Sequence, residues 1–196
     1  MSALSEAALV PADDRGTWRS WLAANHATAR GAWLVTWRQG HGPVLAYEDA
    51  VEEALCFGWV DSTAGRVDDR RSKLYFAPRK PGSGWAATNK ARVERLLAAG
   101  LMQPAGVAAV ERAMADGSWT SLDAIEQGIV PDDLAAALAA HPPAAVNFDA
   151  FPKSARRAIL DWIAAAKRPE TRAARVRETA ERAALNARAN ERPEKR

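Results

Sequence analysis

Apolar residues fall at helical spacing in two early segments of the chain. The first helix is predicted to begin at Asp13 or Asp14, either of which can cap it, and to run to about Ala27. Its apolar stripe consists of Trp18, Trp21 and Leu22. The second predicted helix spans 47–57, carries its acids on the opposite side from its apolar residues, and ends at Gly58.

Alternating and branched-aromatic segments predict three strands, at 32–38, 59–63 and 72–77. In the first, Trp33, Val35 and Trp37 share one face. Such a row can stack nucleic-acid bases when exposed, but burial of large aromatic side chains is strongly favourable, so we interpret it as core. Residues 1–13 are expected to form a loosely held lead-in.

The remaining segments are predicted to be helical. A Gly- and Pro-rich loop at 78–84 precedes a helix from about Trp85 to Ala99, with Ser83 as its expected cap. Another helix begins at Pro104 and ends at Asp116. After residue 117 strand patterns are absent, and helices are predicted at 131–140, from 152, and from 169 to about 187.

This order predicts an α+β fold: a small antiparallel-type sheet packed with helices, followed by an α-helical C-terminal segment. We place the α/β N-terminal domain at 1–117 and the helical segment at 118–196.

Composition is typical of a globular protein. The chain has 196 residues, of which 48% are hydrophobic and 26% are charged, and its net charge is +3. The Arg-rich end is interspersed with acids, as on a solvated helix, so nucleic-acid binding is not favoured. A single cysteine excludes an internal disulfide framework. The apolar runs are too short for a membrane span and the start lacks a signal-peptide pattern, so we expect a cytoplasmic protein without membrane insertion.

Three runs of sequence together resemble the bacterial YdeI/OmpD-associated, or bacteriocin-protection, family. They are residues 47–61, residues 76–85 with Asn89, and residues 159–172. The resemblance implies a small bacterial cytosolic protein with an α/β N-terminal part and a helical C-terminal part. It also implies a link to tolerance of antimicrobial peptides or envelope stress, without an established reaction. This chain departs from the family in having Ala46 where Ser or Thr is common, which predicts a weaker helix cap, and in the short loop at His41.

The second helix and the third strand carry the candidate chemistry. Glu53 and Cys56 share a helix face and Asp61 follows the turn, so these three are the candidate catalytic residues. The candidate ligand-binding residues are Trp59, Lys73, Tyr75, Arg79, Ser83, Trp85 and Asn89. If they converge, they form a charged pocket with aromatic walls.

Each candidate also has a plainer interpretation. Cys56 is expected to be a small buried residue rather than a nucleophile. Glu53 and Asp61 can be an acid–base pair, but we favour ion pairs with Lys73, Arg79 or Arg92. Neither the spacing of His and Cys nor a phosphate-loop motif predicts a metal or cofactor.

Three functions therefore stay open. The first is binding of a small polar or anionic ligand, or of a protein partner, by a stress-tolerance protein. The second is an enzyme using Glu53 and Asp61 for acid–base chemistry. The third is a nucleic-acid-associated protein using the Arg-rich C-terminal helix.

Overall fold

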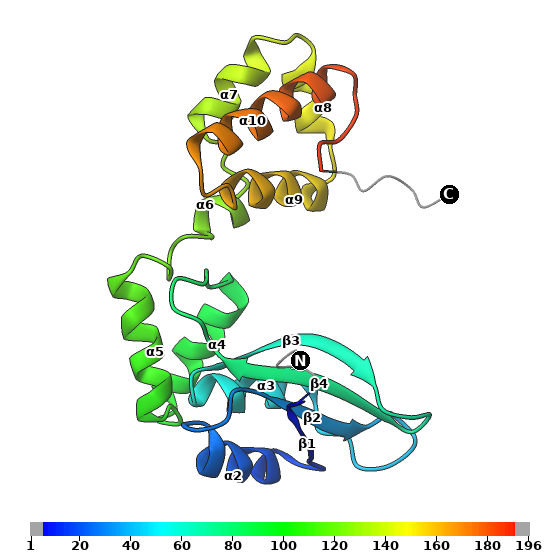
Figure 1. Ribbon diagram of the computed structural model, residues 1–196, viewed down its shortest axis with the longest axis vertical. Helices are drawn as coiled ribbons and strands as arrows, with labels where there is room; N and C mark the ends of the chain where they lie inside the picture. Colours follow the sequence, from blue (N-terminus) through cyan, green and yellow to red (C-terminus); the bar gives the residue numbers. More distant parts are fainter. Residues whose placement is uncertain (1–5, 191–196) are drawn as a thin grey trace. The chain divides into compact units, whose positions relative to one another are not determined.

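The computed structural model describes residues 6–190. It divides into two compact units, Met1–Ser121 and Leu122–Arg196, each with its own hydrophobic core. Figure 1 shows that the first unit contains the sheet with helices α2 to α5, whereas the second contains helices α6 to α10. The fold is α+β, as predicted. The division falls between residues 121 and 122, slightly beyond the boundary inferred from the sequence.

The described residues form a four-stranded sheet with the order β1-β2-β4-β3. Its strands are β1 (Ala8–Pro11), β2 (Ala32–Trp37), β3 (Trp59–Arg66) and β4 (Arg71–Pro78). β4 pairs antiparallel with both β2 and β3, but β1 pairs parallel with β2. The sheet is therefore mixed rather than wholly antiparallel, and part of the expected lead-in is an edge strand.

Helices α2 (Arg15–Asn25) and α3 (Tyr47–Cys56) provide much of the first core. Asp14 caps α2, because its carboxylate accepts a hydrogen bond of 2.7 Å from the Thr17 N–H. Ala46 stands at the cap position of α3 without a side-chain hydrogen bond, as the sequence predicted. The largest side chains fully buried in this core are Trp18, Trp59, Trp85 and Phe76.

Helices α4 (Ala87–Ala98) and α5 (Pro104–Ala115) complete the first unit. The prediction that Ser83 caps α4 is wrong. Its hydroxyl donates to the Lys80 carbonyl at 2.7 Å and closes the loop, while Ala86 occupies the cap position. Gly106 of α5 lies against the last turn of α3, where a Cβ atom would stand 2.2 Å from the Cys56 carbonyl oxygen. Only glycine permits this approach.

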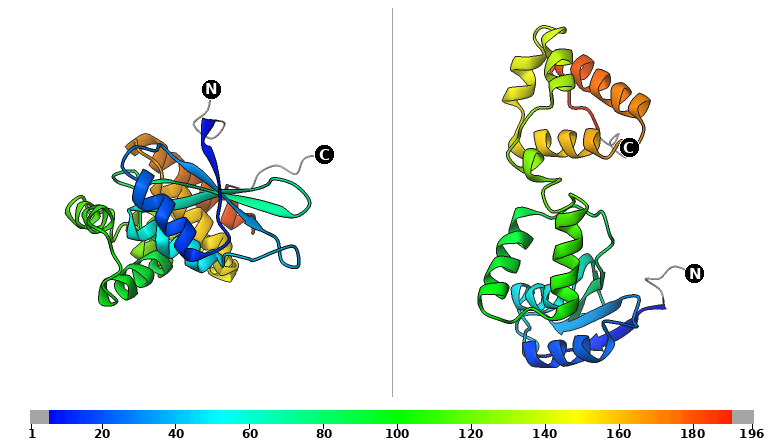
Figure 2. Two further views of the ribbon diagram at one scale, coloured as in Figure 1. Left: turned by 90° about the horizontal axis from the view of Figure 1, so that it is seen from below. Right: turned by 90° about the vertical axis from the view of Figure 1, so that its left-hand side faces the viewer.

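The described part of the second unit, residues 122–190, is helical, with no strand. Its helices are α6 (Asp123–Glu126), α7 (Asp132–Ala139), α8 (Ala144–Ala150), α9 (Lys153–Ala164) and α10 (Pro169–Ala184). Figure 2 shows these helices in colours from yellow-green to orange-red. Sequence patterning predicted α7, α9 and α10 but not the short helices α6 and α8.

The arginines of α10 make contacts within the second unit. Arg172 pairs with Asp133 of α7 at 2.7 Å, and Arg182 pairs with Glu178 one turn away at 3.2 Å. The Arg175 guanidinium lies 4.9 Å from the centre of the Trp162 ring. These arginines therefore have carboxylate or aromatic partners, as the interspersed acids suggested.

Candidate functional site

The predicted site residues lie at three separate places in the first unit. Glu53 and Cys56 face α2, Lys73 and Tyr75 lie on the sheet face opposite Phe76, and Asp61, Arg79, Trp85 and Asn89 lie where β3 and β4 approach α4.

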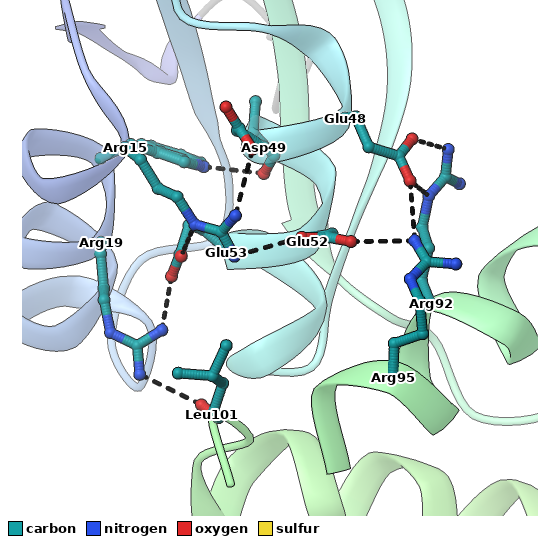
Figure 3. A network of polar contacts seen from close by, with 11 residues as sticks. Arg15, Arg19, Glu48, Asp49, Glu52, Glu53, Arg92, Arg95 and Leu101 are labelled. Atoms are coloured by element: carbon teal, nitrogen blue, oxygen red, sulfur yellow. Dashed lines mark hydrogen bonds and ion pairs between the residues drawn. The ribbon is translucent and has the colours of Figure 1, made fainter. Parts of the chain in front are cut away.

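Glu53 is held by two arginines of α2. Its side chain is 3% exposed and accepts hydrogen bonds from Arg15 Nε and, at 2.6 Å, from Arg19 Nη1. Arg19 also donates to the Leu101 carbonyl at 3.1 Å. We call Arg15, Arg19 and Glu53 the Glu53 clamp. Figure 3 shows the carboxylate of Glu53 between the two guanidinium groups.

Further ion pairs extend from the clamp. Arg15 also contacts Asp49 at 3.1 Å and Glu52 at 3.2 Å, and Glu52 in turn contacts Arg95 of α4 at 2.9 Å. The ion pair predicted for Glu53 exists, but with partners from α2 rather than Lys73, Arg79 or Arg92. An open groove of about 560 Å³ runs beside this network. Because both Glu53 oxygens already accept charge-assisted hydrogen bonds, the carboxylate is poorly placed to take a proton from a substrate.

Cys56 is fully buried beside the clamp. Burial raises the pKa of its thiol, and the negative charge of Glu53 raises it further. A nucleophilic cysteine needs the opposite, an accessible thiol with a lowered pKa. The geometry agrees with the plainer interpretation of Cys56 as a core residue.

The Cys56 thiol is therefore expected to be unreactive in the folded protein. With Ellman's reagent under native conditions, we expect its labelling rate to follow the rate or population of unfolding and to rise steeply with urea. Denatured protein provides the control for full reactivity. Rapid stoichiometric labelling without denaturant would contradict the buried assignment.

Lys73 and Tyr75 form a second cluster with Trp33 of β2. The Lys73 ammonium lies 4.3 Å from the centre of the Trp33 ring, and the Tyr75 ring packs edge-on against it at 5.2 Å. Side chains alternate along a strand, so these two point away from Phe76, which packs on Trp18 in the core. Trp59 is fully buried on the core side, and its Nε1 donates to the His26 carbonyl. None of these contacts joins Lys73, Tyr75 or Trp59 to Arg79.

Asp61 and Asn89 belong to the third place, where α3, β3 and α4 meet. The Tyr47 hydroxyl donates to Asp61 at 2.9 Å, and the Arg92 guanidinium lies 6.0 Å from the Tyr47 ring centre. Arg92 donates to the Asn89 side chain at 2.7 Å and pairs with Glu48 at 2.5 Å. Asp61 thus accepts a hydrogen bond from Tyr47. Arg92 pairs with Glu48 rather than with Glu53 or Asp61, the two acids that the sequence suggested.

Arg79 differs from the arginines of the Glu53 clamp. Its guanidinium stacks 3.9 Å from the Trp85 ring centre, and its Nη2 donates to the Gly84 carbonyl. Its Nε atom is buried and has no hydrogen-bond partner among residues 6–190, and no carboxylate of those residues lies within ion-pair distance of it. Burial lowers the pKa of Arg79 to about 10, although the charge of Asp61 opposes this shift. The structure therefore holds a partly desolvated cation whose charge lacks a direct counter-ion.

A small cavity of about 10 Å³ adjoins Arg79. Its polar wall includes Lys80, Arg112, Asp116 and Ser118, and Trp85 and α5 supply apolar walls. Asp116 accepts hydrogen bonds from the N–H groups of Ser118 at 2.9 Å and Gly82 at 3.1 Å. We call Arg79, Lys80, Trp85, Arg112 and Asp116 the Arg79 site. Such a site can donate hydrogen bonds to an anionic oxygen.

Sequence reasoning missed four contributors: Arg15 and Arg19 of the clamp, and Arg112 and Asp116 of the Arg79 site. Each pair is spaced four residues apart in one helix or at its end, so each pair shares one side of that helix. The spacing of four residues can be recognised in the sequence and indicates that the two side chains of each pair lie on one side of a helix. Which segment each pair contacts depends on the tertiary fold.

Two features are absent from the described residues. Within residues 6–190 there is no group of three or more His, Cys, Asp or Glu side chains that could hold a metal ion. In the same part of the chain, no helix is both long and apolar enough to cross a membrane.

The fold and its contacts define a two-unit α+β protein with a small cationic cavity in the first unit. The chain belongs to the domain-of-unknown-function family DUF8412, whose model matches residues 10–109. In the second unit, residues 127–186 match the model of the bacteriocin-protection, YdeI or OmpD-associated family. The resemblance to the YdeI/OmpD-associated family is thereby confirmed through the second unit, which contains the run at 159–172. The runs at 47–61 and 76–85 fall within the DUF8412 match. No curated protein and no solved structure matches the chain.

Proposed function

We propose that this protein is a cytoplasmic stress- or antimicrobial-peptide-tolerance factor that works by binding a small polar or anionic ligand at the Arg79 site. The name of the family matched by the second unit supports the link to bacteriocin protection. The state of Arg79 supports the choice of ligand.

The single observation that carries the proposal is the unsatisfied Nε of Arg79. A buried donor without a partner typically costs about 1–3 kcal/mol, and more when the group is charged. An anion that accepts from Nε would remove this cost and also supply a counter-charge for a guanidinium without a direct ion pair. A protein partner can satisfy the same donor by presenting an anionic group of its own.

The contacts give less support to the two alternatives. Acid–base catalysis by Glu53 and Asp61 would need two available carboxylates, but Glu53 is enclosed by Arg15 and Arg19, and Asp61 accepts a hydrogen bond from Tyr47. Nucleic-acid binding by α10 would draw on arginines that already have partners within the second unit.

Replacing Arg79 is expected to abolish stabilisation by anions. A ligand present at one hundred times its Kd stabilises a protein by about 2.7 kcal/mol, which thermal-shift measurement detects readily. We expect a panel of small anions, at constant ionic strength, to include compounds that raise the Tm of the full chain but not that of Arg79→Ala.

A matched control is Arg70→Ala, which removes an exposed arginine from the connection between β3 and β4. It should retain the full response, because it lies outside the Arg79 site. Equal stabilisation of the wild type and Arg79→Ala by every active anion would overturn the proposed site.

A further inference from the structure

The Arg79 site offers few free donors to a ligand. One Nη of Arg79 already donates to the Gly84 carbonyl, while Nε has no partner among the described residues. Gly82 and Ser118 direct their N–H groups to Asp116 rather than into open space. A ligand is therefore recognised chiefly by one planar guanidinium, whose fork matches the planar geometry of a carboxylate.

The size of the cavity limits what can enter. A volume of about 10 Å³ corresponds to roughly one water molecule. One oxygen of an anionic group fits this space, and the rest of the group must lie at the mouth, beside the exposed Lys80 and Arg112.

The fixed charges limit the charge of the ligand. Arg79, Lys80 and Arg112 supply three positive charges. Two carboxylates oppose them: Asp116 lines the cavity, and Asp61 acts electrostatically on Arg79. Three positive and two negative charges leave one positive charge, which a single negative charge neutralises and a dianion exceeds.

Building on the proposed function, we infer that the Arg79 site binds a single carboxylate, presented either by a small organic acid or by the C-terminus of a peptide. Asp116 is the residue that sets this preference. Its own carboxylate stands beside the bound group and repels a second negative charge, so it discriminates against phosphate dianions.

The test is an NMR titration of the full-length protein that follows the Arg79 Nε–H resonance, assigned by its absence from Arg79→Lys. The probes are acetate, a short N-acetylated peptide with a free C-terminus, the same peptide as its C-terminal amide, and inorganic phosphate at pH 8. We expect acetate and the peptide acid to shift the resonance saturably, the amide to leave it unchanged, and phosphate to bind at least about tenfold more weakly than acetate.

The four probes distinguish a small organic acid from a peptide C-terminus as the source of the carboxylate. They also distinguish failure of the carboxylate inference from failure of the proposed anion site. Tighter binding of the peptide acid than of acetate identifies a peptide C-terminus, whereas equal binding identifies a small organic acid; both support the inference. Phosphate binding as tightly as acetate overturns the carboxylate inference but leaves the anion site intact. If every probe leaves the Nε–H resonance unchanged, the donor serves a bound water at most, and the proposed function fails as well.

The Asp116→Asn variant tests the origin of the preference. Asparagine keeps the size and removes the charge, and its one acceptor oxygen retains one of the two hydrogen bonds, because the Gly82 and Ser118 N–H groups donate to different oxygens of Asp116. The ratio of phosphate to acetate affinity is expected to rise about tenfold relative to the wild type. An unchanged ratio, in a variant with a wild-type amide spectrum, would show that Asp116 does not set the preference.

Discussion

Replacing Glu53 by glutamine is expected to lower the free energy of unfolding of the first unit by about 3 kcal/mol. Breaking one side of a buried ion pair typically costs about 3–5 kcal/mol, because it leaves the remaining charges uncompensated. Arg15 and Arg19 are each about one-third exposed and can turn partly to water, so we expect a value near the lower end of that range. Urea denaturation of the full chain measures the change.

The control is Glu48→Gln, which removes a carboxylate from the same helix. Glu48 also contacts two arginines, Arg92 and Arg95, but its side chain is 49% exposed. Surface ion pairs contribute about 0–1 kcal/mol, so this variant should remain within 1 kcal/mol of the wild type. Similar losses of unfolding free energy in the two variants would mean that the buried ion pairs of Glu53 stabilise the unit no more than the exposed ion pairs of Glu48.

Gly106→Ala is expected to destabilise the first unit at least as much, by about 3 kcal/mol or more. Its Cβ would stand 2.2 Å from the Cys56 carbonyl oxygen and 2.8 Å from that of Leu55, and backbone atoms of a helix end cannot move aside easily. α5 must therefore shift away from α3, which weakens the packing of Val110 and Ala113 in the core. The shift also strains the hydrogen bond from the Gln103 N–H to the Cys56 carbonyl.

Gly16→Ala provides the comparison for this change. Gly16 also lies in the first turn of a helix, α2, but its Cβ would meet only the Asp14 side chain, at 3.3 Å. Alanine has a higher helix propensity than glycine by up to about 1 kcal/mol, but the Asp14 cap must shift slightly to make room for it, so this variant should stay within about 1 kcal/mol of the wild type. Destabilisation of Gly16→Ala equal to that of Gly106→Ala would point to a general effect of the substitution rather than to the close helix contact.

Local patterns in the sequence predicted much of the first unit. Periodicity located α2, α3, β2 and β4, and Asp14 was recognised as a helix cap because capping depends on neighbouring residues alone. β1 was missed because four residues give little periodicity and the strand exists through its pairing with β2. Ser83 was misassigned because a hydroxyl before a helix can also bond within its own loop, as it does to Lys80.

The site was less predictable than the fold. The sequence singled out Arg79, Trp85 and Asp61, and the structure places the first two in direct contact, with Asp61 near enough for its negative charge to raise the pKa of Arg79 against the effect of burial. It could not show that Glu53 faces α2, since that depends on how two helices pack. The pattern around residue 75 was equally compatible with either sheet face lining a pocket.

The division into two cores has a spectroscopic consequence. Of the eight tryptophans, only Trp162 lies in the second unit, and the other seven lie in the first. Indole fluorescence is thus mainly a signal from the first unit, while far-ultraviolet circular dichroism also follows the helices α6 to α10. Comparing the two signals in one denaturation experiment makes the second unit an internal reference for every substitution made in the first.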